Sequence, residues 1–372
     1  VERLDECRVM VVDANRKREC LICKPFAQPE TTIYVQYNVT GHNENFNSTI
    51  YSIHQNFNNQ VTLNLIDVVV NKEGVYIPHA FVIEPDYMVD VSSISECFQN
   101  FGAAADLYLL KKFLPFSYSV PLMLGNVANF FLDELMTDAD VNFVETFPKA
   151  FALNPLAFAT FTDSEILQIY RRSQKHFTNL KSIVKVKLKE NNITPEDCYL
   201  EPSFYSEKYG IQGRLDIWYQ NPESEQNSAI VELKSGKPFM ANQYGISDSH
   251  YVQALLYDLM VKSVYQQKDP RNYILYSRNA IDNLRFAPVL KTKQNEALSI
   301  RNQIITLEQM LVDLHQQKDK DFTILDKITP ERYPKMKGFN SRDIQFFSKI
   351  LNSISPLERS YFLSFCSFNA RE

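Results

Sequence analysis

The chain has 372 residues, of which 45% are hydrophobic and 22% charged, so it is long enough for two or three globular domains with their own cores. Its net charge of −5 argues against a uniformly basic protein that coats nucleic acid, but it leaves room for a local basic groove. The sequence has no apolar run of about 18 residues, so we expect no membrane span. The 6 cysteines are dispersed and no signal peptide is recognised, which predicts a reduced, cytoplasmic setting.

Residues 1–90 are predicted to form an all-β, barrel-like domain. Segments 31–37 and 61–70 are rich in β-branched and aromatic residues, as strands are. A turn signal at 71–74 precedes a further apolar run that reaches Ile83. Short strands joined by polar turns are typical of a small barrel or sandwich.

From residue 92 the pattern becomes that of helices and strands in alternation. Apolar residues recur with helical spacing in three regions, which are 94–113, 124–136 and 151–190. The last region is long enough for two helices, and Asp163 is a candidate N-cap for the second. Further on, strands are expected at 210–219, 229–233 and 271–277. A helix at 249–264 is expected between the second and third of these strands.

These segments predict a mixed α/β core over residues 91–290, with a sheet flanked by helices. Residues 291–372 are expected to form a helical C-terminal extension. Its main element is a long amphipathic helix at 292–316.

Two carboxylates and a lysine belong to adjacent predicted strands. Asp216 lies within the otherwise apolar segment 215–218, and Glu232 follows the apolar run 229–231. Carboxylates in such runs are costly unless they bind a cation or another partner. The alternation of a strand puts Glu232 and Lys234 on one face. If the strands are neighbours, the three side chains converge at one sheet edge, which is the minimum set for metal-dependent cleavage of a phosphodiester.

Parts of this pattern also occur in proteins without such a site. A Glu-x-Lys pair is common on solvated strand faces, and a buried salt-bridge cluster would have the same composition as the proposed site. Gln253 and Tyr257 lie one helical turn apart, with His250 one turn before Gln253. They form either an ordinary polar helix face or an edge that contacts phosphate beside the metal.

The motifs Gly213-x-x-Asp216, Glu232-x-Lys234 and Gln253-x-x-x-Tyr257 resemble, in this order, those of RecB-like PD-(D/E)xK nucleases. The nearest in appearance are nuclease domains fused to superfamily 1 helicases, including replication helicase–nucleases that trim flaps. The resemblance covers about residues 90–290 and implies a restriction-endonuclease-like core.

Roles for individual residues follow from this resemblance alone. Asp216 and Glu232 would bind Mg²⁺ or Mn²⁺, joined by the backbone carbonyl of Leu233. Lys234 would be catalytic, and the helix that carries Gln253 and Tyr257 would support the site.

Two further metal ligands are expected by the same resemblance. Family members carry Gly-x-x-x-His on an earlier helix, where the histidine completes the metal shell. Here the match is Gly125 with Asn129, so an amide oxygen replaces the imidazole and is expected to bind the metal more weakly. Glu201 precedes the Asp216 strand, where relatives often carry an acidic residue, and is the second additional candidate.

Several relatives also hold a [4Fe–4S] cluster with one cysteine before the nuclease core and three after it. Cys97 resembles the first of these, but only Cys366 follows Tyr257. We therefore expect no iron–sulfur cluster and expect Cys97 to be a small buried residue. The Cys20-x-x-Cys23 pair lacks the second ligand pair of a zinc site.

The leading hypothesis is a Mg²⁺- or Mn²⁺-dependent deoxyribonuclease that acts on single-stranded or flapped DNA in replication or repair. Lys181, Lys185, Lys187 and Lys189 either line a path for the strand or form a solvated helix face. No phosphate-binding P-loop occurs, and the resemblance implies a helicase domain beyond Glu372. The alternative is a degenerate nuclease fold that binds DNA or acts as a scaffold for a helicase, which Asn129 favours. An RNA substrate is a third possibility.

Overall fold

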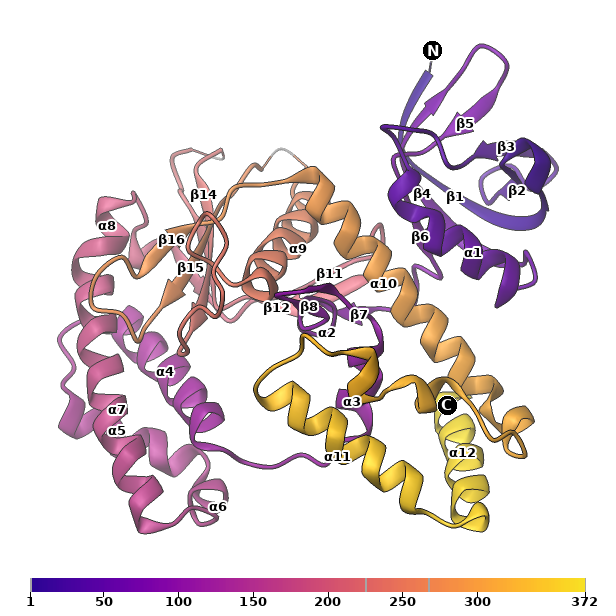
Figure 1. Ribbon diagram of the computed structural model, residues 1–372. Helices are drawn as coiled ribbons and strands as arrows, with labels where there is room; N and C mark the ends of the chain where they lie inside the picture. Colours follow the sequence, from indigo (N-terminus) through magenta and orange to yellow (C-terminus); the bar gives the residue numbers. More distant parts are fainter. Residues whose placement is uncertain (1, 225, 267, 372) are drawn as a thin grey trace. The chain divides into compact units, whose positions relative to one another are not determined.

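The computed structural model describes residues 2–224, 226–266 and 268–371, and the chain forms two compact units with mixed α/β structure (Figure 1). The first unit contains residues 1–114, 205–211 and 291–372, and the second contains 115–204 and 212–290. Segment 91–114, expected to begin the nuclease core, thus belongs to the first unit. None of the helices in the described ranges is long and apolar enough to cross a bilayer.

The first unit starts with a closed five-stranded barrel, which confirms the barrel-like N-terminal domain. The strands follow the order β1-β2-β3-β5-β4, and β4 pairs back with β1, while β6 is added beside β4. Their bounds are β1 (Glu2–Asn15), β2 (Cys20–Pro25), β3 (Ile33–Gln36), β4 (Val61–Val70), β5 (Val75–Ile77) and β6 (Ala80–Ile83). A helix that the sequence did not predict, α1 (Asn47–Gln55), joins β3 to β4.

The barrel interior is filled by alternate residues of its strands. Val9, Val11, Leu21, Val35 and Leu63 are all 0% exposed. This alternation is the period of two that a strand with one buried face requires.

The rest of the first unit is built mainly from short elements and the long helix α10 (Lys291–Val312), which ends in a 3₁₀ turn. The other elements are β7 (Val89–Asp90), α2 (Val91–Ser95), β8 (Phe98–Gln99), β9 (Gly102–Ala103), α3 (Asp106–Phe113), α11 (Phe339–Ser353) and α12 (Pro356–Arg371). The prediction of one helix over 94–113 was wrong, because β8 and β9 pair as a hairpin between α2 and α3. Gly102 in this hairpin has φ +122°, which no helix allows.

Helix α10 satisfies backbone groups of the first unit with side chains. Asn302 accepts the N–H of Ile83 (3.1 Å) and donates to the carbonyl of Phe81 (2.6 Å), so it covers part of the β6 edge. This arrangement ties the helix to the barrel by polar contacts as well as by packing.

Arg301, the neighbouring residue on α10, is 0% exposed. Its guanidinium donates to the backbone carbonyl oxygens of Gly210 (3.1 Å), Glu84 (2.9 Å), Tyr87 (2.6 Å) and Ile83. Burial lowers its pKa to about 9. Gly210 has φ +60°, and a Cβ there would lie 2.8 Å from Cζ of Arg301, so the close approach depends on glycine.

The second unit contains a five-stranded mixed sheet in the order β10-β13-β14-β15-β16. The strands are β10 (Cys198–Leu200), β13 (Ile217–Gln220), β14 (Ser228–Lys234), β15 (Arg271–Tyr276) and β16 (Leu284–Phe286). Only β14 and β15 are parallel among these neighbours, and α9 (Asp248–Val264) forms the crossover that a parallel pair needs. Strands β11 (Ser203–Ser206) and β12 (Ile211–Arg214) lie where the chain passes between the units.

Helices cover both faces of this sheet, as the sequence predicted. One face packs Leu233 and Val231 into a core with Phe131, while the other packs Ile274 against Leu255 of α9. The helices on the first side include α4 (Val120–Thr137), α5 (Phe143–Leu153), α6 (Pro155–Phe158), α7 (Asp163–Ser182) and α8 (Leu188–Glu190). β14 is therefore buried on both faces, which explains its near-continuous apolar sequence.

The predicted N-cap of α7 was one residue late. Thr162, not Asp163, is the cap, because its hydroxyl accepts the N–H of Glu165 (3.3 Å). The Glu165 carboxylate in turn accepts the N–H of Thr162 (2.9 Å), which completes a capping box.

Replacing Arg301 by leucine should destabilise the first unit strongly. The substitution leaves buried carbonyl oxygens without donors, each of which costs about 1–3 kcal/mol, so we expect a loss of about 3 kcal/mol or more in the free energy of unfolding. Chemical denaturation followed by circular dichroism would measure it. Arg3→Leu, at an exposed position on β1, is the control and should change stability by about 0.5 kcal/mol or less. A loss as small in Arg301→Leu as in the control would contradict this role.

Candidate active site

Strands β13 and β14 bring Asp216 and Glu232 side by side. Ile217 pairs with Val231 in an antiparallel register, so the next pair along the two chains is Asp216 with Glu232. Oδ2 of Asp216 accepts the backbone N–H of Leu233 at 2.6 Å. The first carboxylate is thereby fixed to the backbone of the strand that carries the second.

A hydrogen-bond network connects β14 to α9. The Lys234 ammonium donates to Oε1 of Glu232 (3.0 Å) and to Oε1 of Gln253 (2.7 Å). The Gln253 amide donates to Oε1 of Glu232 (2.8 Å) and to the Tyr257 hydroxyl (3.1 Å). The Tyr257 hydroxyl donates to the carbonyl oxygen of Arg214 at 2.9 Å. The structure thus brings the five predicted catalytic residues together within one unit.

The direction of these hydrogen bonds is determined by their end points. The Arg214 carbonyl can only accept, so the Tyr257 hydroxyl uses its proton there and accepts from the Gln253 amide. This leaves the Gln253 carbonyl oxygen to face Lys234, which can only donate. Tyr257 and Gln253 therefore orient the lysine, and burial raises the pKa of Tyr257 so that its hydroxyl stays protonated at neutral pH.

The two carboxyl groups repel one another in a buried setting. Glu232 is only 5% exposed, and its Oε2 is buried without a donor other than the neighbouring carboxyl group of Asp216. Burial raises the pKa of Asp216 well above its ordinary value, and the neighbouring Glu232 charge raises it further, while Lys234 opposes the shift. Two carboxyl groups this close together form a donor set that suits a hard divalent cation, which takes oxygen ligands.

Helix α4, which carries Asn129, packs on the face of the sheet to which Leu233 points. A Cβ at Gly125 would lie 3.6 Å from Oγ of Ser235, the residue after Lys234. Asn129 follows Gly125 by four residues and is half-buried, so it lies one turn further along the same face. Glu232 lies on the opposite face of β14 from Leu233, so this packing does not bring Asn129 to the carboxylate pair, and its role as a ligand stays a prediction.

Asp133, one more turn along α4, is a candidate site residue that the sequence analysis missed. Burial and the Glu201 charge raise its pKa to about 6, and Arg214 opposes this shift. Its spacing of four residues from Asn129 was the available signal, because both residues lie on one helical face.

Glu201 lies beside Asp216 through its backbone, but its side chain has a different partner. The Glu201 N–H donates to the carbonyl of Asp216 (3.0 Å), with Glu201 at a positive φ of 50°. Its carboxylate forms an ion pair with Arg214 at 3.2 Å. Glu201 therefore borders the carboxylate pair, and Arg214, which is largely exposed, adds a positive charge that the sequence analysis did not consider.

His250 is close to the network and uncharged at neutral pH. Its Nδ1 lies 2.9 Å from the hydroxyl of Tyr276, which pairs with Lys234 across β14 and β15. Burial, with a smaller contribution from the Lys234 charge, lowers its pKa to about 3. It is therefore a neutral neighbour and not a cationic contact for phosphate.

The lysines in the last turn of α7 and just after it are mostly engaged with neighbouring groups of their own unit. Lys181 donates to the carbonyl of Val141 (2.6 Å), Lys185 pairs with Asp140 (2.6 Å) and Lys187 pairs with Glu190 (2.8 Å). Lys189 is exposed. This arrangement corresponds to a solvated helix face more closely than to a basic path.

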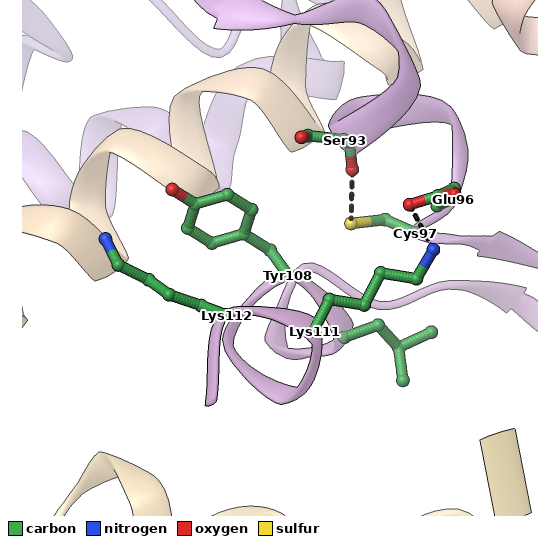
Figure 2. A pocket seen from close by; sticks show the side chains of 7 residues that line it. Ser93, Glu96, Cys97, Tyr108, Lys111 and Lys112 are labelled. Atoms are coloured by element: carbon green, nitrogen blue, oxygen red, sulfur yellow. Dashed lines mark hydrogen bonds and ion pairs between the residues drawn. The ribbon is translucent and has the colours of Figure 1, made fainter. Parts of the chain in front are cut away.

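The cysteines singled out in the sequence are buried in the first unit. Cys97 is 1% exposed, and burial raises its pKa to about 12, so its thiol is protonated. It lines a cavity of about 270 Å³, in which Lys111 is paired with Glu96 (Figure 2). The other lysine of the lining, Lys112, is paired with Glu308. Cys23 of the barrel is also buried, and burial raises its pKa.

In residues 2–224, 226–266 and 268–371, no three His, Cys, Asp or Glu side chains converge as a preformed metal centre. Of the predicted ligands, Asp216 and Glu232 lie side by side and Glu201 borders them through its backbone. No protein-family model and no curated protein matches the chain. The candidate site accordingly depends on its geometry and on the motif order alone.

Asp216→Asn should stabilise the metal-free protein at neutral pH. A carboxyl group with a raised pKa keeps its proton in the folded chain where the unfolded chain has lost it, so the free energy of unfolding falls as the pH rises above about 3.8. Asparagine removes this penalty, which amounts to about 1.4 kcal/mol for each pKa unit. Denaturation followed by fluorescence of Trp218, the single tryptophan and 2% exposed, would measure the difference at pH 5 and pH 8 with a chelator present.

The matched control is Asp140→Asn in the same unit. The hydrogen bond and charge of Lys185 lower the pKa of Asp140, so its contribution to stability is gained as the pH rises. The stability of this variant relative to the native protein should therefore fall, or stay level, from pH 5 to pH 8. The account of the carboxyl pair would be wrong if the stability of Asp216→Asn, relative to the native protein, also fell or stayed level from pH 5 to pH 8.

Proposed function

We propose that the second unit is a PD-(D/E)xK nuclease core of the RecB-like kind, which hydrolyses DNA phosphodiester bonds with Mg²⁺ or Mn²⁺. One observation carries this proposal, namely the adjacent carboxyl groups of half-buried Asp216 and buried Glu232, with Lys234 hydrogen-bonded to Glu232 at 3.0 Å. A structural salt bridge would need one carboxylate, and a second one beside it is costly without a cation.

The assignment of roles follows the network. Asp216, Glu232 and the carbonyl oxygen of Leu233 would hold the ion, with Asn129 as a side-chain ligand from α4. When bound, the ion would neutralise the pair, polarise the phosphate and lower the pKa of bound water. Lys234 supplies positive charge next to the phosphate that is attacked, and Gln253 with Tyr257 keeps the ammonium in place.

The kind of substrate follows from the family resemblance of the motifs. Relatives of this appearance act on single-stranded or flapped DNA in replication and repair, and they are joined to a helicase. We extend both properties to this protein as part of the proposal. Cleavage of labelled single-stranded DNA with Mg²⁺ or Mn²⁺, compared with an RNA of equal sequence, tests the activity and the type of nucleic acid.

A second candidate function is a nuclease fold without activity that binds DNA as a module of a helicase. It is favoured by Asn129 in place of histidine, since an amide oxygen is a weaker ligand than imidazole for Mn²⁺. Trp218 follows Asp216 by two residues, so quenching of its fluorescence by Mn²⁺ would report binding at the site. DNA binding without any Mn²⁺ binding would support this second function.

Lys234→Ala should reduce metal-dependent cleavage by about 100-fold or more, the usual loss when a positioned charge-stabilising or proton-transferring group is removed. Asp216→Ala should have an effect at least as large. A gel assay of labelled single-stranded DNA with a chelator control would measure both. Lys175→Ala, at an exposed position on α7, should cleave at the native rate. Native activity in Lys234→Ala would overturn the assigned site.

Asn129→His should strengthen Mn²⁺ binding by about tenfold, because imidazole is a better ligand for this metal. Asn129→Ala should weaken it. Titration of Trp218 fluorescence with Mn²⁺, in parallel with the rate of DNA cleavage, would give both values. If neither substitution changed the Mn²⁺ affinity, Asn129 would lie outside the metal shell.

A further inference from the structure

The outer surface of barrel strands β1 to β3 exposes large apolar side chains. Tyr34 and Phe26 are each 50% exposed, and Met10 is 36% exposed. The inward side chains of the same strands are fully buried, so this exposure is confined to the outer face. Large exposed apolar side chains that lie together mark interaction surfaces.

The strand register places these side chains next to one another and next to basic residues. Tyr34 pairs with Ile22, and Met10 pairs with Lys24. The ladder continues to Phe26, whose N–H donates to the carbonyl of Arg8 at 2.9 Å. Paired residues on neighbouring strands point to the same side. We call the set Arg8, Met10, Ile22, Lys24, Phe26 and Tyr34 the barrel face.

Positive charge borders the barrel face. Arg16, Lys17 and Arg18 form the turn between β1 and β2, and all three are exposed, as is Lys24. The Arg8 guanidinium lies 5.3 Å from the centre of the Phe26 ring. The barrel face therefore combines aromatic rings with a cluster of cations.

Acidic residues also lie near the barrel face. Glu6 is exposed two residues before Arg8 and therefore lies on the same side of β1. Asp86 pairs with Arg8, and Glu19 accepts a hydrogen bond from Asn38 at 2.6 Å. Asp13 pairs in register with Ile22 and accepts the N–H of Ala14 (2.8 Å). On the side of the turn, Arg16, Lys17, Arg18 and Lys24 outnumber the carboxylates of Asp13 and Glu19, which leaves that side electropositive.

We propose that the barrel face binds single-stranded nucleic acid. Unpaired bases offer flat apolar surfaces for stacking on Tyr34 and Phe26, and the phosphates between them match Lys24 and the cationic turn. A duplex hides its bases in the stack and would gain only the charge contacts. Small five-stranded barrels provide a strand face and its bordering loops for oligonucleotides, which agrees with this location.

The inference is independent of the nuclease assignment, because it rests on residues of the barrel alone. The barrel face would contact the single-stranded nucleic acid at a place other than the nuclease site, and this binding does not require cleavage. An experiment without metal therefore separates the two proposals, since binding is measured while hydrolysis cannot proceed.

The test measures fluorescence anisotropy of a labelled single-stranded DNA of about 16 nucleotides with the full chain and a chelator. Tyr34→Ala should weaken binding about tenfold, within the range for loss of one stacked base. Tyr34→Phe keeps the ring and should bind as the native chain does. Lys17→Glu should weaken binding by a similar factor and reduce its salt dependence. The matching duplex should bind at least about tenfold more weakly than the single strand.

Two controls match these variants in residue type. Tyr51→Ala removes a tyrosine that is 66% exposed on α1, and Lys320→Glu reverses an exposed charge after α10. Both should bind as the native chain does. Native affinity in Tyr34→Ala and Lys17→Glu, or equal affinity for single strand and duplex, would overturn the proposal. If only Lys234→Ala weakened binding, the barrel proposal would fail while the nuclease proposal stood.

Discussion

The candidate site depends on two carboxyl groups that lie side by side at neighbouring interior strands of the sheet, one half-buried and one buried. Asp216 is tied to the N–H of Leu233, and Glu232 is tied to Lys234 and Gln253, so neither group can move away from the other without breaking hydrogen bonds. The surrounding fold excludes solvent from the pair and keeps the two groups adjacent, which raises the pKa of Asp216. Such a cost is typical of functional sites, where local strain is kept for chemistry.

Helix α9 determines which groups donate and which accept in the hydrogen-bond network. From the Arg214 carbonyl the hydrogen bonds pass through Tyr257 and Gln253 to Lys234, and each step fixes the donor of the next. The crossover between parallel strands β14 and β15 places α9 over Glu232. The hydrogen-bond network therefore follows from the topology of the sheet. The lysine is thus positioned before any ligand arrives, as electrostatic preorganisation requires.

The sequence predicted those parts of the site that depend on local periodicity. Alternation put Glu232 and Lys234 on one strand face, and the four-residue spacing put Gln253 and Tyr257 on one helix face. The sequence did not predict contacts between side chains of different elements, such as the ion pair of Glu201 with Arg214. The fold shows the same division. The barrel and the mixed sheet followed from strand patterns, whereas the division into units did not, because residues 205–211 and 291–372 return to the first unit through contacts far apart in sequence.

The most direct test of the central claim is a crystal structure of the protein soaked with Mn²⁺, with anomalous scattering used to locate the metal. The account predicts one Mn²⁺ ion between the carboxylates of Asp216 and Glu232, with the Lys234–Gln253 hydrogen bond retained. Absence of an anomalous peak at the pair, with the Lys234 ammonium as the only cation beside Glu232, would contradict it.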